Sequence, residues 1–528
     1  MNRKDYTRRA FLQMSSVTFA GSLLPWKLRA SAENKKASVI IDAANITGEV
    51  SPLIYGQFIE HLGRAIYGGI YEEHSPLSNN QGFRKDVLEK VKALQAPLLR
   101  YPGGTVTKIY HWKDGIGSKA QRPVRKNLIW GGEDNNHFGT DEFMQYCALT
   151  GSDPFITVNM STGTAEEAAD WVEYCNSNGN AYFAALRRKH GHTKPYNVKY
   201  WGLGNEEAAR EDAGILQSPA DYIERAWYYA KLMKLQDPDI ALIMVGENEA
   251  WNKAILEELH PIADYISLHL YANSKPGQPA SLFDSIASME QRIKTTVSQI
   301  QQITPAKVEK FGKWYRFPPR KEKVKIALDE WGIWESGGHG VYNLEVDYNW
   351  NHALGVASFL NIFQRNAADI GLATWAQTVN VLAPIMTDGN RSVCQTVFYP
   401  LMMYRKLCGN QHLATQLQGP HLEGDFNHLP ALDVSATLND KTGELTLAVV
   451  NRDASAGIDV SLQVNNNEVG GDWEMHTLNA SGIDAINTLQ HHDKNVVIQQ
   501  SRQLPATTTS VNVMPHSIVL LKARLKKS

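Results

Sequence analysis

Three glutamates come directly after runs of residues that favour β-strands: Glu60, Glu206 and Glu330. A single carboxylate at a strand end usually caps a helix or joins a loop ion pair. Two carboxylates that face each other across one site can cleave a glycosidic bond, because one protonates the leaving oxygen while the other attacks the anomeric carbon. The set therefore predicts acid–base and nucleophilic chemistry on a glycoside.

The neighbours of these glutamates suggest a division of roles. Proton donation requires a carboxyl that is neutral near pH 7, whereas attack requires an ionised one. Asn205 precedes Glu206 and offers an amide to a sugar hydroxyl beside the reacting carbon. We therefore assign Glu206 as the acid/base and Glu330 as the nucleophile, and we expect the two carboxyls to titrate together.

Aromatic residues accompany the predicted site. Trp201, Trp331, Trp334 and Trp375 are expected at the same end of the strands, where sugar rings pack against aromatic faces. Filling of the hydrophobic core explains Trp201 and Trp375 equally well.

The elements that must hold these residues alternate in type between residues 52 and 408. Eight short apolar runs are interpreted as strands, and the amphipathic stretches between them as helices. This rhythm predicts a (β/α)₈ TIM barrel, with an open doubly wound sheet as the alternative. The predicted strands are 53–58, 97–101, 154–159, 198–203, 240–245, 265–270, 324–328 and 370–375; the clearest helices are 84–94, 165–175, 221–235, 282–303 and 351–365. In such a barrel, strands four and seven would present Glu206 and Glu330 to each other from opposing sides.

The pattern of apolar residues changes after the predicted barrel. Residues 409–528 lose helical periodicity and alternate in short apolar runs between Asn, Gly and Asp turns, which predicts a C-terminal β-sandwich. Residues 33–51 contain a further strand that would join this sandwich. A basic, aromatic-rich stretch at 307–325 is interpreted as a solvated loop over the barrel mouth.

Residues 1–32 have the pattern of an export signal. Arginines at positions 8 and 9 precede an apolar run, and Ala30-Ser31-Ala32 offers a cleavage site. The paired arginines favour the twin-arginine type, so we expect the chain to be exported to the periplasm or the exterior. A frayed basic N-terminus is the alternative.

Composition excludes several classes of protein. The chain has 528 residues, a net charge of −2, 43% hydrophobic and 20% charged residues, which is typical of a globular protein. There is no basic excess for nucleic acid and no apolar stretch long enough for stable membrane insertion. The four cysteines form no metal-ligand pattern, and their spacing leaves open whether two of them form a disulfide.

Several ordered segments resemble the α-L-arabinofuranosidases of glycoside hydrolase family 51. These segments are 54–64, 99–104, 201–206, 266–271 and 329–331, and the likeness runs from residue 54 to about 400. The family fold also carries a C-terminal sandwich, which this sequence matches more loosely. The resemblance implies a retaining enzyme that removes terminal α-L-arabinofuranosyl groups from arabinan or arabinoxylan-type substrates.

The resemblance also implies individual roles. Glu60 and Arg100 would hold sugar hydroxyls and Asn205 would hold the 2-OH, while His269 and Tyr271 would lie near the nucleophile. Further substrate contacts are expected from Trp334 and Gln377. We expect no cofactor and no metal, because neither a dinucleotide loop nor a metal-ligand spacing is present. The number of subunits stays open, although related enzymes often form homo-oligomers.

Two positions depart from the family pattern. Thr105 stands where Asn or Cys is usual, and Gly332 stands where Asn is usual, so substrate preference is less fixed than the chemistry. One alternative is the same two-glutamate barrel acting on another glycoside, as an endo-β-glucanase or a β-xylosidase. A non-catalytic polysaccharide-binding protein is the alternative from another class.

Overall fold

The computed structural model describes residues 35–209, 213–216, 218–303, 322–335 and 337–526. The export signal expected at 1–32 lies outside the described residues, as does most of the basic stretch at 307–325. Among the residues described, no helix combines the length and apolarity required to cross a membrane.

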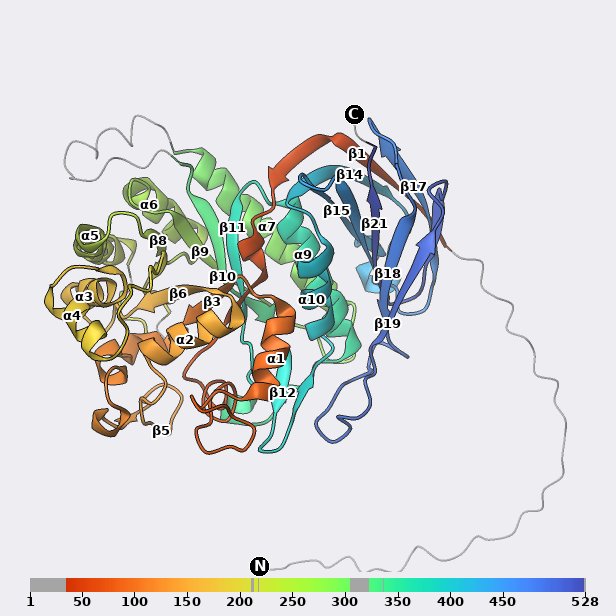
Figure 1. The fold of residues 1–528 in the computed structure, drawn as a ribbon. Helices are drawn as coiled ribbons and strands as arrows, with labels where there is room; N and C mark the ends of the chain where they lie inside the picture. The colour runs from red at the N-terminus through yellow and green to blue at the C-terminus, as the bar shows by residue number, and fades with distance from the viewer. Residues whose placement is uncertain (1–34, 210–212, 217, 304–321, 336, 527–528) are drawn as a thin grey trace, which may run out of the picture. The chain divides into compact units, whose positions relative to one another are not determined.

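Eight parallel strands close into a barrel, which confirms the predicted TIM-barrel class (Figure 1). Around the closed sheet the strands follow the order β10-β11-β2-β3-β6-β7-β8-β9. Their bounds are β2 (Gly56–Phe58), β3 (Leu98–Tyr101), β6 (Asp153–Val158), β7 (Tyr200–Leu203), β8 (Ala241–Met244), β9 (Tyr265–Ala272), β10 (Lys325–Ile333) and β11 (Ile370–Ala376). Strands four and seven of the barrel, β7 and β10, are separated on one side by β8 and β9 alone, so they do not stand diametrically opposite.

Helices surround the barrel and begin where the sequence supplies caps. Thr164 accepts a hydrogen bond from the Glu167 amide, Ser218 caps a helix that starts with Pro219, and Asn349 caps another. The helices are α1 (Lys85–Leu94), α2 (Thr140–Thr150), α3 (Ala165–Asn176), α4 (Tyr182–Lys189), α5 (Pro219–Gln236), α6 (Glu249–Leu259), α7 (Ser281–Gln301), α9 (Trp350–Arg365) and α10 (Phe398–Leu407).

The first barrel strand is shorter than expected. Pro52–Tyr55 form a 3₁₀ turn whose start is capped by the Ser51 hydroxyl, although residues 53–55 were predicted as strand. Proline fixes the backbone angle that such a turn requires and lacks the amide that a strand would use. Only Gly56–Phe58 enters the barrel, immediately before Glu60.

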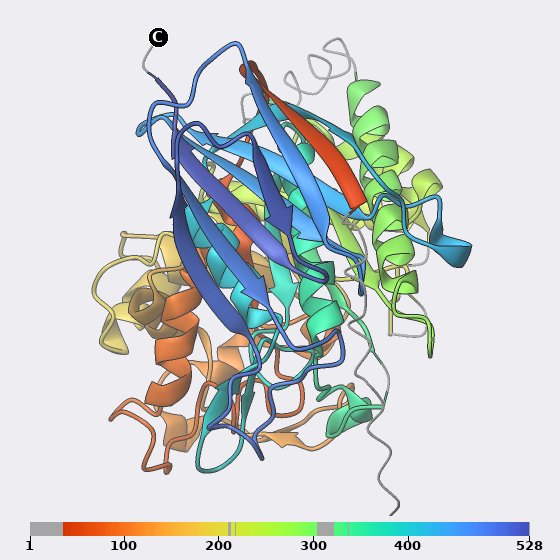
Figure 2. The same ribbon diagram turned by 90° about the vertical axis from the view of Figure 1, so that its right-hand side faces the viewer.

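The C-terminal region is a β-domain, as predicted, and its nine strands form one continuous hydrogen-bonded sheet (Figure 2). β1 lies between β14 and β17, antiparallel to the first and parallel to the second. The strands are β1 (Lys35–Glu49), β14 (Gln411–Gln418), β15 (Leu432–Asn439), β16 (Glu444–Asn451), β17 (Ile458–Asn465), β18 (Trp473–Asn479), β19 (Ile498–Leu504), β20 (Ser510–Val513) and β21 (Ile518–Arg524). Two small hairpins, β4 (Arg125–Lys126) with β5 (Glu133–Asp134) and β12 (Ile385–Thr387) with β13 (Ser392–Cys394), extend the barrel loops.

α9 is buried along almost its whole length, because it contacts barrel elements as well as strands β15 and β16 of the C-terminal sheet. This explains a helix that is apolar on nearly every face. All four cysteines are free thiols in the structure, and Cys147 and Cys175 are buried.

Candidate active site

The turn after β7 presents Glu206 in an unusual backbone conformation. Glu206 has φ +46°, in the left-handed region that non-glycine residues rarely adopt. Gly204 has φ +85°, and a Cβ there would lie 2.6 Å from the Glu207 carboxylate. That carboxylate accepts the Asn205 amide at 3.2 Å, while Lys108 Nζ donates to the Glu206 carbonyl at 3.1 Å. The turn is thus held from two sides, which fixes the direction of Glu206.

Glu330 is placed by an irregularity within β10. Ala327 pairs with Ser267 and Glu330 pairs with His269, so β10 carries one more residue than β9 over this interval. Such a bulge re-aims side chains. Neighbouring Asp329 and Glu330 both reach toward Arg100 as a result, although in a regular strand they would face opposite sides. The strand continues to Ile333, so the predicted end at residue 328 is wrong.

Arg100 is fully buried beneath the two catalytic candidates. Its Nη1 donates to Glu330 Oε1 at 2.7 Å, and its Nη2 donates to Asn205 Oδ1 at 2.6 Å. Charge-assisted bonds of this kind are strong and directional. The structure therefore places Arg100 against protein groups rather than in the cavity wall, where the expected contact with a sugar hydroxyl would have put it.

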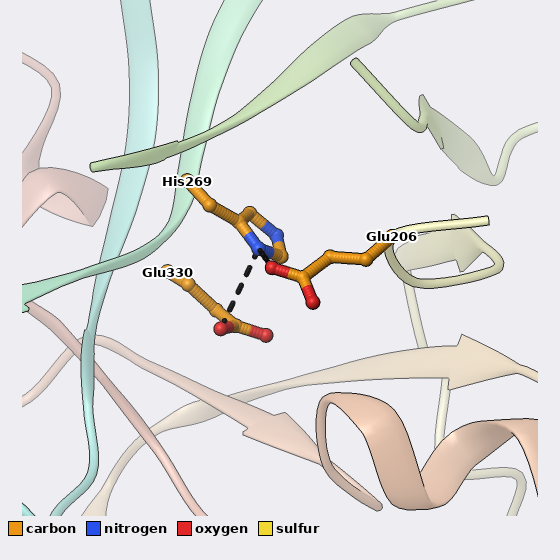
Figure 3. A group of neighbouring side chains, drawn as sticks. All are labelled: Glu206, His269 and Glu330. Carbon is orange, nitrogen blue, oxygen red and sulfur yellow. Dashed lines mark hydrogen bonds and ion pairs between the residues drawn. The ribbon is translucent and has the colours of Figure 1, made fainter. Parts of the chain in front are cut away.

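His269 lies between the two glutamates (Figure 3). Its Nδ1 is 2.7 Å from Glu206 Oε1 and 3.5 Å from Glu330 Oε2. Tyr271 donates its hydroxyl to Glu330 Oε2 at 2.8 Å. One ligand atom from each of Glu206, His269 and Glu330 lies within 4.8 Å of the other two. The carboxyl groups thus stand about as close as in retaining glycosidases, where the separation is roughly 5 Å.

The three side chains also offer atoms close enough to share a metal ion. A short hydrogen bond already joins His269 and Glu206, so an ion would have to displace its proton. The arrangement can transfer that proton directly between nitrogen and oxygen.

The electrostatics of this pair differ from the sequence expectation. Burial alone would raise the pKa of Glu206, but the adjacent His269 lowers it below its usual value. Burial acts to lower the pKa of His269, and Glu330 and Glu206 overcome it and raise that pKa to about 9. In the free protein the proton therefore resides on the imidazole, and Glu206 is not the neutral carboxyl expected from sequence. The groups titrate as a unit.

Glu60 is also part of the site, and this residue is 3% exposed. It accepts hydrogen bonds from Trp130 Nε1 at 2.9 Å, the Val106 amide at 3.1 Å and Gln377 Nε2 at 3.0 Å. Burial and the nearby charge of Glu330 raise the pKa of Glu60 to about 7. A carboxyl in this state can donate or accept a hydrogen bond at neutral pH.

A cavity of about 160 Å³ lies between these groups. This is below the roughly 300 Å³ at which pockets for drug-sized ligands begin, so it suits one small ring. Its polar and aromatic lining includes Glu60, Thr105, Trp130, Glu206, Tyr271, Glu330, Trp334 and Gln377. A second cavity of about 540 Å³ adjoins it, sharing Thr105, Trp130, Trp334 and Leu344.

Two polar atoms at this site lack a partner. Asn205 Nδ2 and Gln377 Oε1 are buried without a hydrogen bond to any described residue. Because buried polar groups are normally paired, a donor and an acceptor left open in one site indicate a hydroxyl-bearing ligand.

Of the four tryptophans expected near the site, Trp201 and Trp375 follow the alternative of core filling, and the expectation for Trp331 is wrong. Trp201, Trp331 and Trp375 are completely buried, and Trp331 packs edge-to-face on Trp375 at 4.9 Å. Alternation along the strands turns these rings toward the helices, where they fill the core. Trp334, which follows β10, is 43% exposed and does line the cavity.

Two residues of the site were missed. Trp130 reaches Glu60 from the loop between β4 and β5, a segment with no periodic pattern to mark it. Asp329 was not predicted as a residue of the site, because strict alternation along a strand would turn its side chain away from that of Glu330. Only the bulge brings it inside, and a sequence gives little warning of a bulge.

The two departures from the family pattern both touch the site. Thr105 lines both cavities. Gly332 lies beside Tyr271, and a Cβ at this position would stand 3.5 Å from the tyrosine ring and 3.3 Å from the Ala376 carbonyl. A larger side chain at this position would therefore press against the Ala376 carbonyl, next to the residue that binds Glu330.

Comparison with known proteins places this site in a family. An α-L-arabinofuranosidase 1 domain matches residues 90–294, and an α-L-arabinofuranosidase C-terminal domain matches residues 329–517. Alpha-L-arabinofuranosidase C of Emericella nidulans is 38% identical over 465 residues, covering 83% of this chain and 89% of that protein. The chain belongs to the α-L-arabinofuranosidases of glycoside hydrolase family 51.

Other members of this α-L-arabinofuranosidase family agree in fold and differ in their names. The thermostable GH51 α-L-arabinofuranosidase from Thermotoga petrophila RKU-1 superimposes with a TM-score of 0.84 at 35% identity, covering 92% of this chain and all of that one. The intracellular exo-alpha-(1->5)-L-arabinofuranosidase of Halalkalibacterium halodurans is 31% identical, covering 88% of this chain and 96% of that protein.

Proposed function

We propose that the protein is a retaining, exo-acting α-L-arabinofuranosidase that removes non-reducing terminal α-L-arabinofuranosyl groups. The observation that carries this proposal is the placement of Glu206 and Glu330 oxygens within 4.8 Å of each other at the edge of a cavity that suits one small ring. Retaining hydrolysis requires this spacing, because one carboxyl must attack the carbon whose leaving oxygen the other protonates.

In the first half of the proposed reaction, Glu330 attacks the anomeric carbon and forms a covalent glycosyl ester. Arg100 and Tyr271 each donate a hydrogen bond to one of its two oxygens and so fix the direction of the carboxylate. The bond to the leaving oxygen breaks as Glu206 supplies a proton to that oxygen.

In the second half, a water molecule attacks the same carbon and Glu330 leaves. Glu206 accepts the proton of the water, so the anomeric configuration is restored after two inversions. Asn205 Nδ2 and Gln377 Oε1 are the open donor and acceptor that would receive sugar hydroxyls, with Glu60 beside them.

The substrate is proposed from the two cavities and the relatives. The smaller cavity would hold the terminal furanose, and the larger one, across Trp130 and Trp334, would receive the remainder of an arabinan or arabinoxylan-type chain. One relative is named for exo cleavage of α-1,5 linkages, which supports an exo mode here.

The test of this function uses the two glutamates separately. Glu330→Ala should abolish turnover of 4-nitrophenyl α-L-arabinofuranoside, and azide should partly restore it by forming a β-configured arabinofuranosyl azide. Glu206→Ala should spare substrates with very good leaving groups and lose those with poor ones. Near wild-type rates in both variants on a natural oligosaccharide would refute the proposal, and preferential cleavage of cellulose or β-xylosides would favour the alternative glycosidases.

We further propose that the chain is exported through its twin-arginine-type N-terminal segment. The paired arginines, the apolar run and the Ala-x-Ala site support this, although one relative is named as intracellular. Fractionation of cells that produce the full chain should find it outside the cytoplasm, whereas Arg8→Lys with Arg9→Lys should retain it inside. Equal distribution of both would contradict export. The resemblance also favours a homo-oligomer, which light scattering would test.

A further inference from the structure

A third carboxylate, Asp329, belongs to the catalytic cluster without a role in the two-glutamate reaction. It is 3% exposed and points inward because of the bulge in β10. Its Oδ1 accepts a short hydrogen bond from Ser267 Oγ, and its Oδ2 is 3.6 Å from Arg100 Nη2. Ser267 and Arg100 therefore fix this carboxylate from two sides of its own group.

Asp329 and Glu206 face different nitrogens of the same ring. His269 Nδ1 is 2.7 Å from Glu206 Oε1, and His269 Nε2 is 3.7 Å from Asp329 Oδ1. A doubly protonated imidazole donates from both nitrogens, whereas the neutral ring keeps a hydrogen on one only. A negative charge near Nε2 favours the hydrogen there, which leaves Nδ1 as the nitrogen that exchanges a proton.

This arrangement addresses a need that the proposed reaction creates. An acid/base carboxyl must carry a proton when the leaving group departs, yet His269 lowers the pKa of Glu206 in the free protein. The imidazole can supply this proton, because one hydrogen bond of 2.7 Å joins His269 Nδ1 to Glu206 Oε1. A residue that governs where this ring holds its protons would therefore govern the acid step.

We propose that Asp329 is a positioning residue that acts through His269, keeping a proton on the imidazole that Glu206 receives in the first half of the reaction and returns in the second. The inference rests on the proposed glycosidase function and deepens it, because it names the group that supplies the catalytic proton.

The relay conserves atoms and charge. In the first half, the Nδ1–H bond of His269 breaks and an O–H bond forms on Glu206 Oε1; Glu206 passes this proton to the leaving oxygen, which also keeps the electron pair of the broken glycosidic bond. In the second half, water loses a proton to Glu206 and its oxygen joins the anomeric carbon, while the bond from that carbon to the Glu330 oxygen breaks and Glu330 keeps the electron pair. Glu206 then returns the proton to Nδ1, while Nε2 stays protonated facing Asp329.

Other charged groups also lie near His269. Glu330 faces Nδ1 at 3.5 Å, and Arg292 from α7 donates to the His269 carbonyl at 3.2 Å. Among the ion pairs of the described residues, Asp329 is the partner of Nε2. Arg100 of β3 acts on Glu206 and Asp329, and Lys108 acts on Glu206. Glu247, in the segment after β8, interacts with both Glu206 and His269.

The test compares Asp329→Asn with the wild type on two α-L-arabinofuranosides. For a poor leaving group such as methanol, kcat/KM should fall at least about tenfold, and the basic limb of its pH profile should move to lower pH by about one unit. For 2,4-dinitrophenolate, which needs no proton, kcat/KM should change less than about threefold. An equal loss on both substrates with no shift of the basic limb would show a merely structural role and overturn the relay.

Two further variants keep the test interpretable. Glu345→Gln removes another buried carboxylate, paired with Arg64 outside the cavity, and should leave the basic limb in place. If Asp329→Asn does not fold, Ser267→Ala keeps the charge of Asp329 but removes its hydrogen bond, and should shift the limb in the same direction by a smaller amount. No shift in Ser267→Ala would then count against the relay.

Nitrogen NMR of ¹⁵N-histidine-labelled protein separates this inference from the proposed function. The pKa of the His269 ring should be lower in Asp329→Asn than in the wild type. In the neutral ring of the wild type, Nε2 should carry the hydrogen. An unchanged midpoint would overturn the inference even in an active enzyme. A wild-type protein that hydrolyses no arabinofuranoside would instead overturn the proposed function, while the NMR result would still report on the relay.

Discussion

Two clusters of buried charge in this molecule use similar side chains for different ends. At the contact between α9 and the C-terminal sheet, Asp433 binds Arg365 at 2.8 Å, accepts Asn361 Nδ2 at 2.7 Å and forms a short pair with Arg452. Glu290 adds a second acid opposite Arg365 at 3.3 Å. These side chains leave no buried polar atom without a partner among the described residues.

The catalytic cluster is arranged otherwise. It brings four carboxylates around Arg100 and His269, and it leaves Asn205 Nδ2 and Gln377 Oε1 unpartnered. The four carboxylates are those of Glu60, Glu206, Asp329 and Glu330. A cluster in which each group is satisfied stabilises the fold, whereas excess charge with open hydrogen-bonding atoms signals a site prepared for a ligand.

The largest difference between the clusters should appear in activity. Glu330→Gln keeps the shape of the side chain but removes the nucleophile, so kcat/KM should fall by about 10⁴-fold or more. Its free energy of unfolding, from urea titration, should change by less than about 2 kcal/mol, because the site is not optimised for stability. A variant that lost several kcal/mol of stability would show that this cluster also supports the fold.

The converse experiment removes the centre of the structural cluster. Asp433→Asn leaves the buried Arg452 without its charge partner and leaves the half-buried Arg365 with Glu290 alone, which should cost about 3–5 kcal/mol of unfolding free energy. Activity of the folded fraction should stay within about twofold of wild type, because the cluster touches no part of the cavity. Asp440→Asn, at an exposed turn, is the matched control and should change neither quantity.

One carboxylate from each cluster, Glu60 and Asp433, should make stability respond to pH in opposite directions. Burial and Glu330 raise the pKa of Glu60 to about 7 in the folded state, so the folded protein holds a proton that the unfolded chain releases above its ordinary value near 4.5. Stability therefore decreases as pH rises from about 4.5 to 7. Glu60→Gln should remove this slope and gain about 2–3 kcal/mol above pH 7.

For Asp433 the sign is reversed. Burial opposes ionisation, but Arg365 and Arg452 lower the pKa of this carboxyl below its ordinary value. Its contribution is present above the unfolded value near 3.8 and is lost as pH falls through the lower folded value. Urea unfolding at pH 3 to 8 of the wild type, Glu60→Gln and Asp433→Asn measures both slopes, and slopes of one sign in both regions would refute the contrast.

The smallest effect concerns the rim of the cavity. Trp334 is partly exposed and packs edge-to-face on Tyr271 at 5.3 Å, so Trp334→Ala should raise KM roughly three- to tenfold, an effect of about 1 kcal/mol, with little change in kcat. Trp227→Ala, on a partly buried surface of α5 away from the cavity, serves as the control. A large fall in kcat instead would mean that Trp334 helps to orient Tyr271.

Much of the fold and of the candidate site could be predicted from the sequence, because local residue patterns indicate them. Apolar runs of four to eight residues located the barrel strands, and carboxylates at their ends located Glu60, Glu206 and Glu330. The predictions of strand bounds that failed concern departures from regular strand geometry. The 3₁₀ turn at Pro52 shortened the first strand, and the bulge in β10 extended the seventh past Glu330.

Charge states and loop contacts were beyond the reach of sequence reasoning. The proton shared by Glu206 and His269 depends on a 2.7 Å contact between strands, and Trp130 reaches Glu60 from a segment 70 residues away. The three buried tryptophans show the same limit of prediction from sequence. Residue type alone does not tell which face of a strand a ring occupies.

The measurement that tests the paired glutamates most directly is the configuration of the first product. When the wild-type enzyme transfers arabinose from 4-nitrophenyl α-L-arabinofuranoside to methanol, proton NMR should show methyl α-L-arabinofuranoside, because Glu330 and then methanol each invert the same carbon. Formation of the β-methyl furanoside would mean a single displacement, and it would contradict a nucleophile and an acid placed within 4.8 Å of each other.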